Sequence, residues 1–132
     1  MHYILCDTQY MKKQINMDNQ ERTGEIADKL RLELRRGALP LAVLAQLKEE
    51  HYGYSLRKQL NAQGLDIDEG TLYPLIRRLE KQGLLNSEWR DDQKRKKRYY
   101  RISPLGESVL IVLVRRWNAL NESIDGILGE EE

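Results

Sequence analysis

The chain has 132 residues, of which 33% are charged and 40% are hydrophobic, and its formal net charge is +1 at pH 7. This length suits one domain with a small core, and no apolar run approaches the length of a membrane-spanning helix. The single cysteine, Cys6, excludes an internal disulfide and a cluster of thiolate metal ligands. The apolar patch at 3–6 is too short for a signal peptide, so we expect a cytoplasmic protein without membrane contact.

The first part of the chain predicts a tail followed by a helix. Residues 1–20 show no clear periodicity and are expected to form a flexible tail. Because Met17 would itself make an ordinary start, we expect the first sixteen residues to reflect an upstream start site or to be disordered. The N-terminal helix is predicted over 21–37, where Thr23 could cap it and Gly37 would end it. Its apolar positions are Ile26, Leu30 and Leu34.

Two further helices are predicted between residues 38 and 63. Pro40 suits the first turn of one helix, because its fixed φ is helical and no N–H is needed there. Gly53 breaks the chain, and Gly64 ends a second helix over 54–63. The two helices would form a platform for the segment that follows. Their core positions are Leu41, Val43, Leu44, Leu47, Leu56 and Leu60.

The segment 68–83 predicts a short helix with a signal at each end. Asp68 can accept hydrogen bonds from the free N–H groups of the first turn, and Gly83 can adopt the left-handed conformation that ends the helix. The predicted buried stripe consists of Leu72, Leu75, Ile76 and Leu79. The opposite face carries Thr71, Tyr73, Pro74, Arg77, Arg78 and Lys81. This basic, partly aromatic face suits the DNA major groove, and the alternative is a surface helix with solvated arginines.

A basic hairpin is predicted directly after this helix, with strands at 84–89 and 97–102. Residues 70–103 contain ten basic and four acidic side chains, a local net charge of +6, whereas the whole chain carries +1. Such a local field attracts a polyanion, although the charges could instead keep a solvated hairpin from aggregating. The run expected to contact DNA phosphates is Lys94, Arg95, Lys96, Lys97 and Arg98.

Four aromatic side chains have expected positions near the hairpin and the platform. Tyr99 and Tyr100 point to opposite faces of a strand, and we expect Tyr100 to face the core. We expect Trp89 to pack within the hairpin. Tyr54 could brace the platform or reach a DNA phosphate, and bracing is favoured.

A long helix is predicted over 104–128, followed by an acidic tail at 129–132. Ser103 would be its N-cap and Pro104 its first residue. The stripe expected to face the preceding domain is Leu105, Val109 and Val112. The second stripe is Leu110, Leu113, Trp117, Leu120, Ile124 and Ile127. Its alternating spacing of three and four is that of a heptad seam, which predicts a homodimer, unless the seam folds back onto the N-terminal helix.

Three motifs closely resemble the PadR family of winged-helix transcriptional regulators: the Gly53-Tyr54 pair and the segments 69–84 and 98–106. The resemblance extends over about 34–128. It implies a mainly α (α+β) fold, a winged helix-turn-helix over 38–103 with a two-stranded wing, an N-terminal helix and a long C-terminal dimerisation helix. One departure is that Tyr52 stands where the family often has His, and His51 lies one residue earlier.

The resemblance also implies a dimeric repressor that binds double-stranded DNA at a near-palindromic operator and is often released by a small-molecule effector. In compact members the N-terminal helix embraces the partner subunit, and a helix folded on its own subunit remains equally open here. Trp117 resembles, in position, an aromatic wall of the effector cavity between subunits, and a plain packing anchor is the alternative.

Enzyme functions find no support in the residue pattern. The two histidines, His2 and His51, have no nucleophile, metal-ligand triad or carboxylate partner at a useful spacing, so we expect neither a metal nor a cofactor. The predicted function is a sequence-specific DNA-binding regulator. The alternative is a winged-helix module whose basic wing binds an acidic protein.

Overall fold

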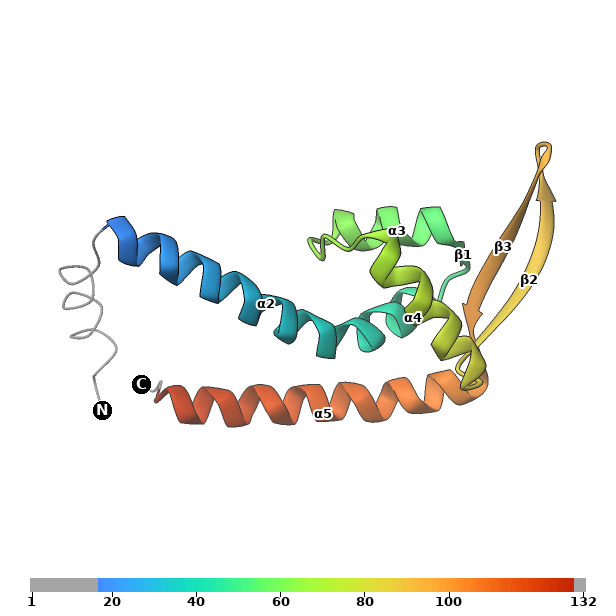
Figure 1. Cartoon of the computed structure of the whole chain (residues 1–132). Coiled ribbons are helices and arrows are strands. Elements are labelled where there is room, and N and C mark those ends of the chain that lie inside the picture. The colour runs from blue at the N-terminus through green and yellow to red at the C-terminus, as the bar shows by residue number, and fades with distance from the viewer. Residues whose placement is uncertain (1–16, 130–132) are drawn as a thin grey trace. The chain divides into compact units, whose positions relative to one another are not determined.

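The computed structural model describes residues 17–129. Residues 1–16 of the predicted tail at 1–20, and residues 130–132 of the predicted acidic tail, lie outside this range. The described chain contains four helices and three strands, and their order can be followed in Figure 1. The elements are α2 (Met17–Gln46), β1 (His51–Tyr52), α3 (Gly53–Ala62), α4 (Glu69–Lys81), β2 (Leu85–Asp92), β3 (Arg95–Ile102) and α5 (Pro104–Leu128). The chain divides into two compact units, of which one is Gly37–Trp117 and the other contains the residues before and after it.

Helix α2 corrects the prediction of two separate helices. It runs without a break through Gly37 and Pro40, and it includes residues 17–20, which were expected to lie before the helix. Thr23, predicted as a possible cap, lies inside it. Proline inside a helix removes one backbone hydrogen bond. Burial compensates for that loss, because the turns around and after Pro40 place Leu39, Val43, Leu44 and Leu47 in the core. The expected apolar positions before them stay exposed, at 50% for Ile26, 54% for Leu30 and 79% for Leu34.

The core of the unit Gly37–Trp117 is built from aliphatic side chains of several elements. The end of α2, α3, α4, the inner ends of β2 and β3, and the start of α5 all contribute. Helix α3 lies within one residue of its predicted bounds, and α4 has both predicted end signals. Asp68 Oδ1 accepts a hydrogen bond from the Thr71 N–H at 3.2 Å, and Gly83 has φ +86°. The predicted buried stripe of α4 is confirmed at Leu72, Leu75, Ile76 and Leu79.

The three strands form an antiparallel sheet in the order β1-β3-β2. Strand β1 was not predicted, because two residues carry no periodic signal; His51 pairs with Tyr100 and Tyr52 with Tyr99. Strands β2 and β3 pair over all eight residues and are longer than expected. Their connection is only Gln93-Lys94, with φ values of 57° and 84°. Two successive positive φ values are typical of the type I′ hairpin turn, so the wing is a regular two-residue hairpin.

The junction between β3 and α5 fixes how α5 is rotated about its axis. The Ser103 hydroxyl donates to the Gly83 carbonyl at 2.6 Å and accepts from the Gly106 N–H at 3.0 Å, which confirms the predicted N-cap. Gly106 lies so close to the Leu84 carbonyl that a Cβ there would overlap its oxygen. The helical face of Gly106 therefore packs on the core.

This rotation corrects the assignment of the two stripes on α5. The face shared with Gly106 carries Val109, Leu110 and Leu113, which pack on the core, and Leu110 is only 4% exposed. Leu105 and Val112, which were expected to face the core, are 54% and 46% exposed. Leu110 and Leu113 are thus occupied within their own domain. The exposed part of the predicted seam is Trp117, Leu120, Ile124 and Ile127.

Candidate nucleic-acid interface

Helix α4 presents a polar and basic face to solvent. Five of the six predicted contact residues are exposed: Thr71, Pro74, Arg77, Arg78 and Lys81. Tyr73 is the exception, because its ring packs beside the first residue of α3; a Cβ on Gly53 would lie 3.0 Å from Tyr73 Cε1. Burial, followed by the charge of Glu69, raises the pKa of the Tyr73 hydroxyl. Tyr73 therefore joins α4 to α3 as well as facing the surface.

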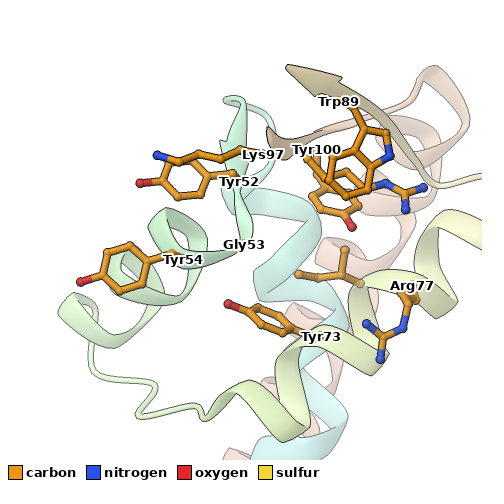
Figure 2. A pocket seen from close by; sticks show the side chains of 10 residues that line it. Tyr52, Gly53, Tyr54, Tyr73, Arg77, Trp89, Lys97 and Tyr100 are labelled. Atoms are coloured by element: carbon orange, nitrogen blue, oxygen red, sulfur yellow. The ribbon is translucent and has the colours of Figure 1, made fainter. Parts of the chain in front are cut away.

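A hollow of about 250 Å³ lies between α3, α4 and the wing (Figure 2). Aromatic rings and cationic side chains share its lining, which consists of Tyr52, Gly53, Tyr54, Tyr73, Ile76, Arg77, Trp89, Lys97, Arg98 and Tyr100. Tyr54 is half exposed, stacks on Tyr52 with ring centroids 6.4 Å apart, and has the Lys58 ammonium 5.7 Å from its ring centre. The hollow gives the surface around α4 both flat rings and hydrogen-bond donors.

The aromatic residues of the wing differ in their burial. The prediction that Trp89 packs within the hairpin is wrong, because Trp89 is 61% exposed. Its partner across the strands is Arg98, whose guanidinium lies 5.6 Å from the Trp89 ring and 5.7 Å from the Tyr100 ring. The prediction for Tyr100 is confirmed, since it packs against the core. Tyr99 contacts Tyr52 instead, at 5.4 Å between ring centroids.

The basic run of the wing divides into two groups. Lys94, Arg95 and Lys96 are exposed at the tip of the hairpin. The Lys97 ammonium lies 3.1 Å from Asp92 Oδ2 and 4.2 Å from the centre of the Tyr52 ring, and the hydrogen bond to Asp92 raises the Lys97 pKa. Arg98 lies 3.0 Å from Glu80 Oε2 on α4. Two of the five cations predicted to contact phosphates therefore have acidic partners within the domain.

Four residues with defined partners were missed by sequence reasoning: Glu50, Glu80, Ser87 and Arg90. Glu80 Oε2 accepts from the Ser87 hydroxyl at 2.5 Å, in addition to its pairing with Arg98. Arg90 Nη1 donates to Glu50 Oε1 at 2.7 Å, forty positions away in the chain. Only pairing across elements connects these residues, so no local pattern could have found them.

The described residues contain neither a metal-ligand cluster nor a membrane span. In residues 17–129, no three His, Cys, Asp or Glu side chains are grouped as a metal site would require. No helix there combines the length and hydropathy needed to cross a bilayer. His51 is part of a structural network, with Nδ1 3.1 Å from the Ser55 hydroxyl and Nε2 3.4 Å from the Gln46 side-chain nitrogen.

Residues 41–111 match the family described as "Transcriptional regulator PadR-like family". The chain belongs to this family. A PadR-family transcriptional regulator of Eggerthella lenta has a similar crystal structure, with a TM-score of 0.80, 41% identity, and coverage of 84% of this chain and 99% of that one. A PadR-like transcriptional regulator of Bacillus cereus is 28% identical, with a TM-score of 0.67 over 75% of this chain and 99% of its own.

Among relatives compared by sequence, the transcriptional regulator Rv3488 of Mycobacterium tuberculosis is 39% identical over 79 residues, which cover 59% of this chain and 74% of that protein. These similarities confirm the PadR resemblance that the sequence motifs indicated. They also confirm the mainly helical winged-helix fold. The close approach of the Tyr73 ring gives a physical reason for a glycine in the Gly53-Tyr54 pair of the motif.

Proposed function

We propose that this PadR-like regulator is a homodimeric, sequence-specific DNA-binding repressor that a small planar ligand releases from its operator. The observation that carries DNA binding is the presence of exposed cations on both α4 and the wing tip of one domain. These cations are Arg77, Arg78, Lys81, Lys94, Arg95 and Lys96. A second, shallow hollow lined by Arg77, Arg78, Glu80, Lys81 and Arg98 makes the surface continuous from α4 to the base of the wing.

In the proposed complex, α4 enters the major groove and the wing lies on the neighbouring backbone or minor groove. Thr71 and Pro74, on the exposed face of α4, lie deepest in the groove. Arg77 and Arg78 contact guanine edges or phosphates. Lys94, Arg95 and Lys96 bind phosphates with little sequence preference. A dimer would place the two copies of α4 about one helical turn apart on a near-palindromic site.

The proposed dimer uses the exposed stripe of α5. Four large apolar side chains there are 43–74% exposed: Trp117, Leu120, Ile124 and Ile127. Burying a large apolar side chain contributes roughly 1.5–3 kcal/mol, so four per chain give a gross stabilisation of about 6–12 kcal/mol before ordering costs. Covering this stripe with a second copy would remove it from water and would join the two DNA-binding domains.

The proposed effector site includes Trp117, which lies on the same stripe and is 43% exposed. A two-fold axis along α5 would bring its copy close, and paired indoles form a flat apolar slot. Titration of a Trp89→Phe variant with planar cations should give saturable quenching of Trp117 fluorescence. The absence of any saturable change across a broad panel would contradict this part of the proposal.

The experiment for the function as a whole is fluorescence anisotropy with the DNA directly upstream of the protein's own gene, with scrambled DNA as control, over a salt series. If about six to eight phosphates are neutralised per dimer, log affinity should fall with log salt at a slope of roughly −5 to −7. Tighter binding to the upstream DNA supports a sequence-specific regulator that acts on its own gene. Equal and weak binding to both DNAs would instead favour an acidic protein as the partner of the wing.

A further inference from the structure

Glu80 is an acidic side chain on the DNA-facing helix, where a negative charge would repel phosphate. It is only partly exposed, with 24% of its side chain accessible, and it points to the wing instead of to solvent. Its two oxygens lie 3.1 Å and 3.0 Å from Arg98 Nη2 on β3. The Ser87 hydroxyl on β2 donates to Glu80 Oε2 at 2.5 Å. One carboxylate thus ties α4 to both strands of the wing.

Arg98 completes this connection. Its Nε donates to the Ser87 hydroxyl oxygen at 2.9 Å, while its Nη2 reaches Glu80. The guanidinium lies within 6 Å of both the Trp89 and Tyr100 rings, a distance at which cations are attracted to aromatic faces. Arg98 therefore uses its Nε and Nη2 donors within the domain, on Ser87 and Glu80.

A second connection lies further along β2. Arg90 is bound by both oxygens of Glu50, in the segment that joins α2 to β1, at 2.7 Å and 2.5 Å. The Arg90 guanidinium also lies 4.6 Å from the centre of the Tyr99 ring, and its Nε donates to Glu88 at 2.6 Å. Two-point pairing of arginine with a carboxylate fixes direction as well as distance. The hairpin is therefore held at two separate places along its length.

We propose that Glu80 and Arg98, assisted by Glu50 and Arg90, are positioning residues that hold the wing at one orientation relative to α4. DNA binding then depends on Glu80 although its charge has the sign that DNA repels. A winged helix contacts DNA at two places, and a wing that rotates freely must be ordered at a cost in affinity when DNA binds. This inference rests on the proposed DNA-binding function for its effect, but the wing orientation itself can be measured without DNA.

The decisive comparison is between Glu80→Gln and Asp91→Asn. Each removes one negative charge from the same domain with almost no change in shape. Asp91 is exposed on the wing, and among the described residues its side chain has no hydrogen bond or ion pair. Electrostatics alone predicts that both variants bind DNA more tightly. We expect Asp91→Asn to bind slightly more tightly, and Glu80→Gln to lose roughly three- to tenfold in affinity because a charge-assisted link is lost.

The charge swap tests whether Arg98 acts through Glu80 or contacts phosphate directly. Glu80→Arg and Arg98→Glu should each weaken DNA binding, and the double variant should recover a large part of the affinity because the pair is restored with opposite polarity. If Arg98 contacted a phosphate, Glu80→Arg would bind more tightly and the double variant would not recover. That result would overturn the proposal.

The DNA-free measurement uses amide residual dipolar couplings of α4 and of the wing strands. In the wild type and in Asp91→Asn, both elements should fit one alignment tensor. In Glu80→Gln the couplings of β2 and β3 should shrink relative to those of α4, while the thermal unfolding curve remains cooperative. Unchanged wing couplings in Glu80→Gln would overturn the positioning role. Reduced couplings together with a wild type that binds no DNA would instead overturn the proposed function.

Discussion

Gly53 at the start of α3 lies against the ring of Tyr73 on α4. A Cβ at Gly53 would meet Tyr73 Cε1 at 3.0 Å, Cζ at 3.2 Å and the hydroxyl oxygen at 3.3 Å, so the ring would have to move by a few tenths of an ångström. The contact joins the helix expected to enter the groove to the helix behind it. A single missing methyl group therefore sets how closely the two helices approach.

Gly53→Ala should destabilise the winged-helix unit by about 1 kcal/mol, at the lower end of the cost of overpacking. In a Tyr73→Leu background the same substitution should be neutral or slightly stabilising, because alanine favours a helix more than glycine does. The interaction energy from urea unfolding of the four proteins checks this. Equal costs of Gly53→Ala in both backgrounds would show that the ring contact is not responsible.

Gly106→Ala and Gly37→Ala should have opposite effects on stability. A Cβ at Gly106 would overlap the Leu84 carbonyl oxygen, a backbone atom that cannot move away cheaply, whereas nothing lies within 4 Å of a Cβ at Gly37. We expect Gly106→Ala to destabilise the fold by roughly 3 kcal/mol or more. Gly37→Ala, in an exposed part of α2, should stabilise it by about 0.5–1 kcal/mol. Chemical denaturation at one temperature measures both changes.

Periodicity predicted those parts of the fold that local sequence determines. The ends of α4 follow from Asp68 and Gly83, and its buried stripe follows from helical spacing. The continuity of α2 through Pro40 could not be predicted from local sequence. The helical hydrogen bond lost at Pro40 is offset by the burial of neighbouring side chains against residues distant in sequence. The rotation of α5 depends on the contact between Gly106 and Leu84, which exists only once the chain has folded.

In the candidate site, too, local sequence predicted which side chains are exposed on a helix but not which side chains pair between elements. The exposed positions Arg77, Arg78 and Lys81 on α4 follow from the helix alone. From the sequence, Lys97 and Arg98 were predicted to contact phosphates together with the rest of the basic run. In the structure these neighbouring side chains of β3 point to opposite faces, where Lys97 pairs with Asp92 and Arg98 pairs with Glu80. Sequence therefore indicates where positive charge concentrates, and pairing across elements decides which charges remain available.

Replacing Lys94, Arg95 and Lys96 together with Ala should weaken binding to every DNA sequence. These three side chains are exposed at the wing tip, and the salt slope should flatten by about 0.9 for each phosphate that the variant no longer neutralises. The matched control replaces Arg22, Lys29 and Arg31, three exposed cations of α2, and changes the net charge equally. Anisotropy over a salt series distinguishes the two triple variants. An equal loss of affinity in both would mean that only net charge matters and that the wing has no special role.

Leu120→Glu combined with Ile124→Glu should convert the proposed homodimer to monomers. Both residues lie on the exposed stripe of α5, at 56% and 45% exposure, and a buried carboxylate without a partner costs several kcal/mol. Asn118→Glu places the same charge on the polar face of the helix and should leave the assembly intact. Sedimentation velocity over a concentration series gives the association state. A double variant that sediments as the wild type does would contradict the proposed interface.

Acid should release the contact between Glu50 and Arg90. The hydrogen bond from Arg90 holds the pKa of Glu50 below its ordinary value of 4.5, with Arg101 contributing a smaller attraction of the same sign. A carboxylate with a lowered folded-state pKa stabilises the fold above its unfolded pKa, and this contribution is lost as the pH falls through the lowered value.

The wild type should therefore lose stability below pH 4.5 more steeply than Glu50→Gln, which lacks this carboxylate, and Glu50→Gln should be the less stable protein at pH 7. Glu49→Gln removes the same charge from the neighbouring exposed residue and should keep the wild-type profile. Urea unfolding at pH 7 and at steps below pH 4.5, followed by the fluorescence of Trp89 in a Trp117→Phe background, measures the three profiles. Parallel curves for the wild type and Glu50→Gln would show that the pair does not link wing stability to pH.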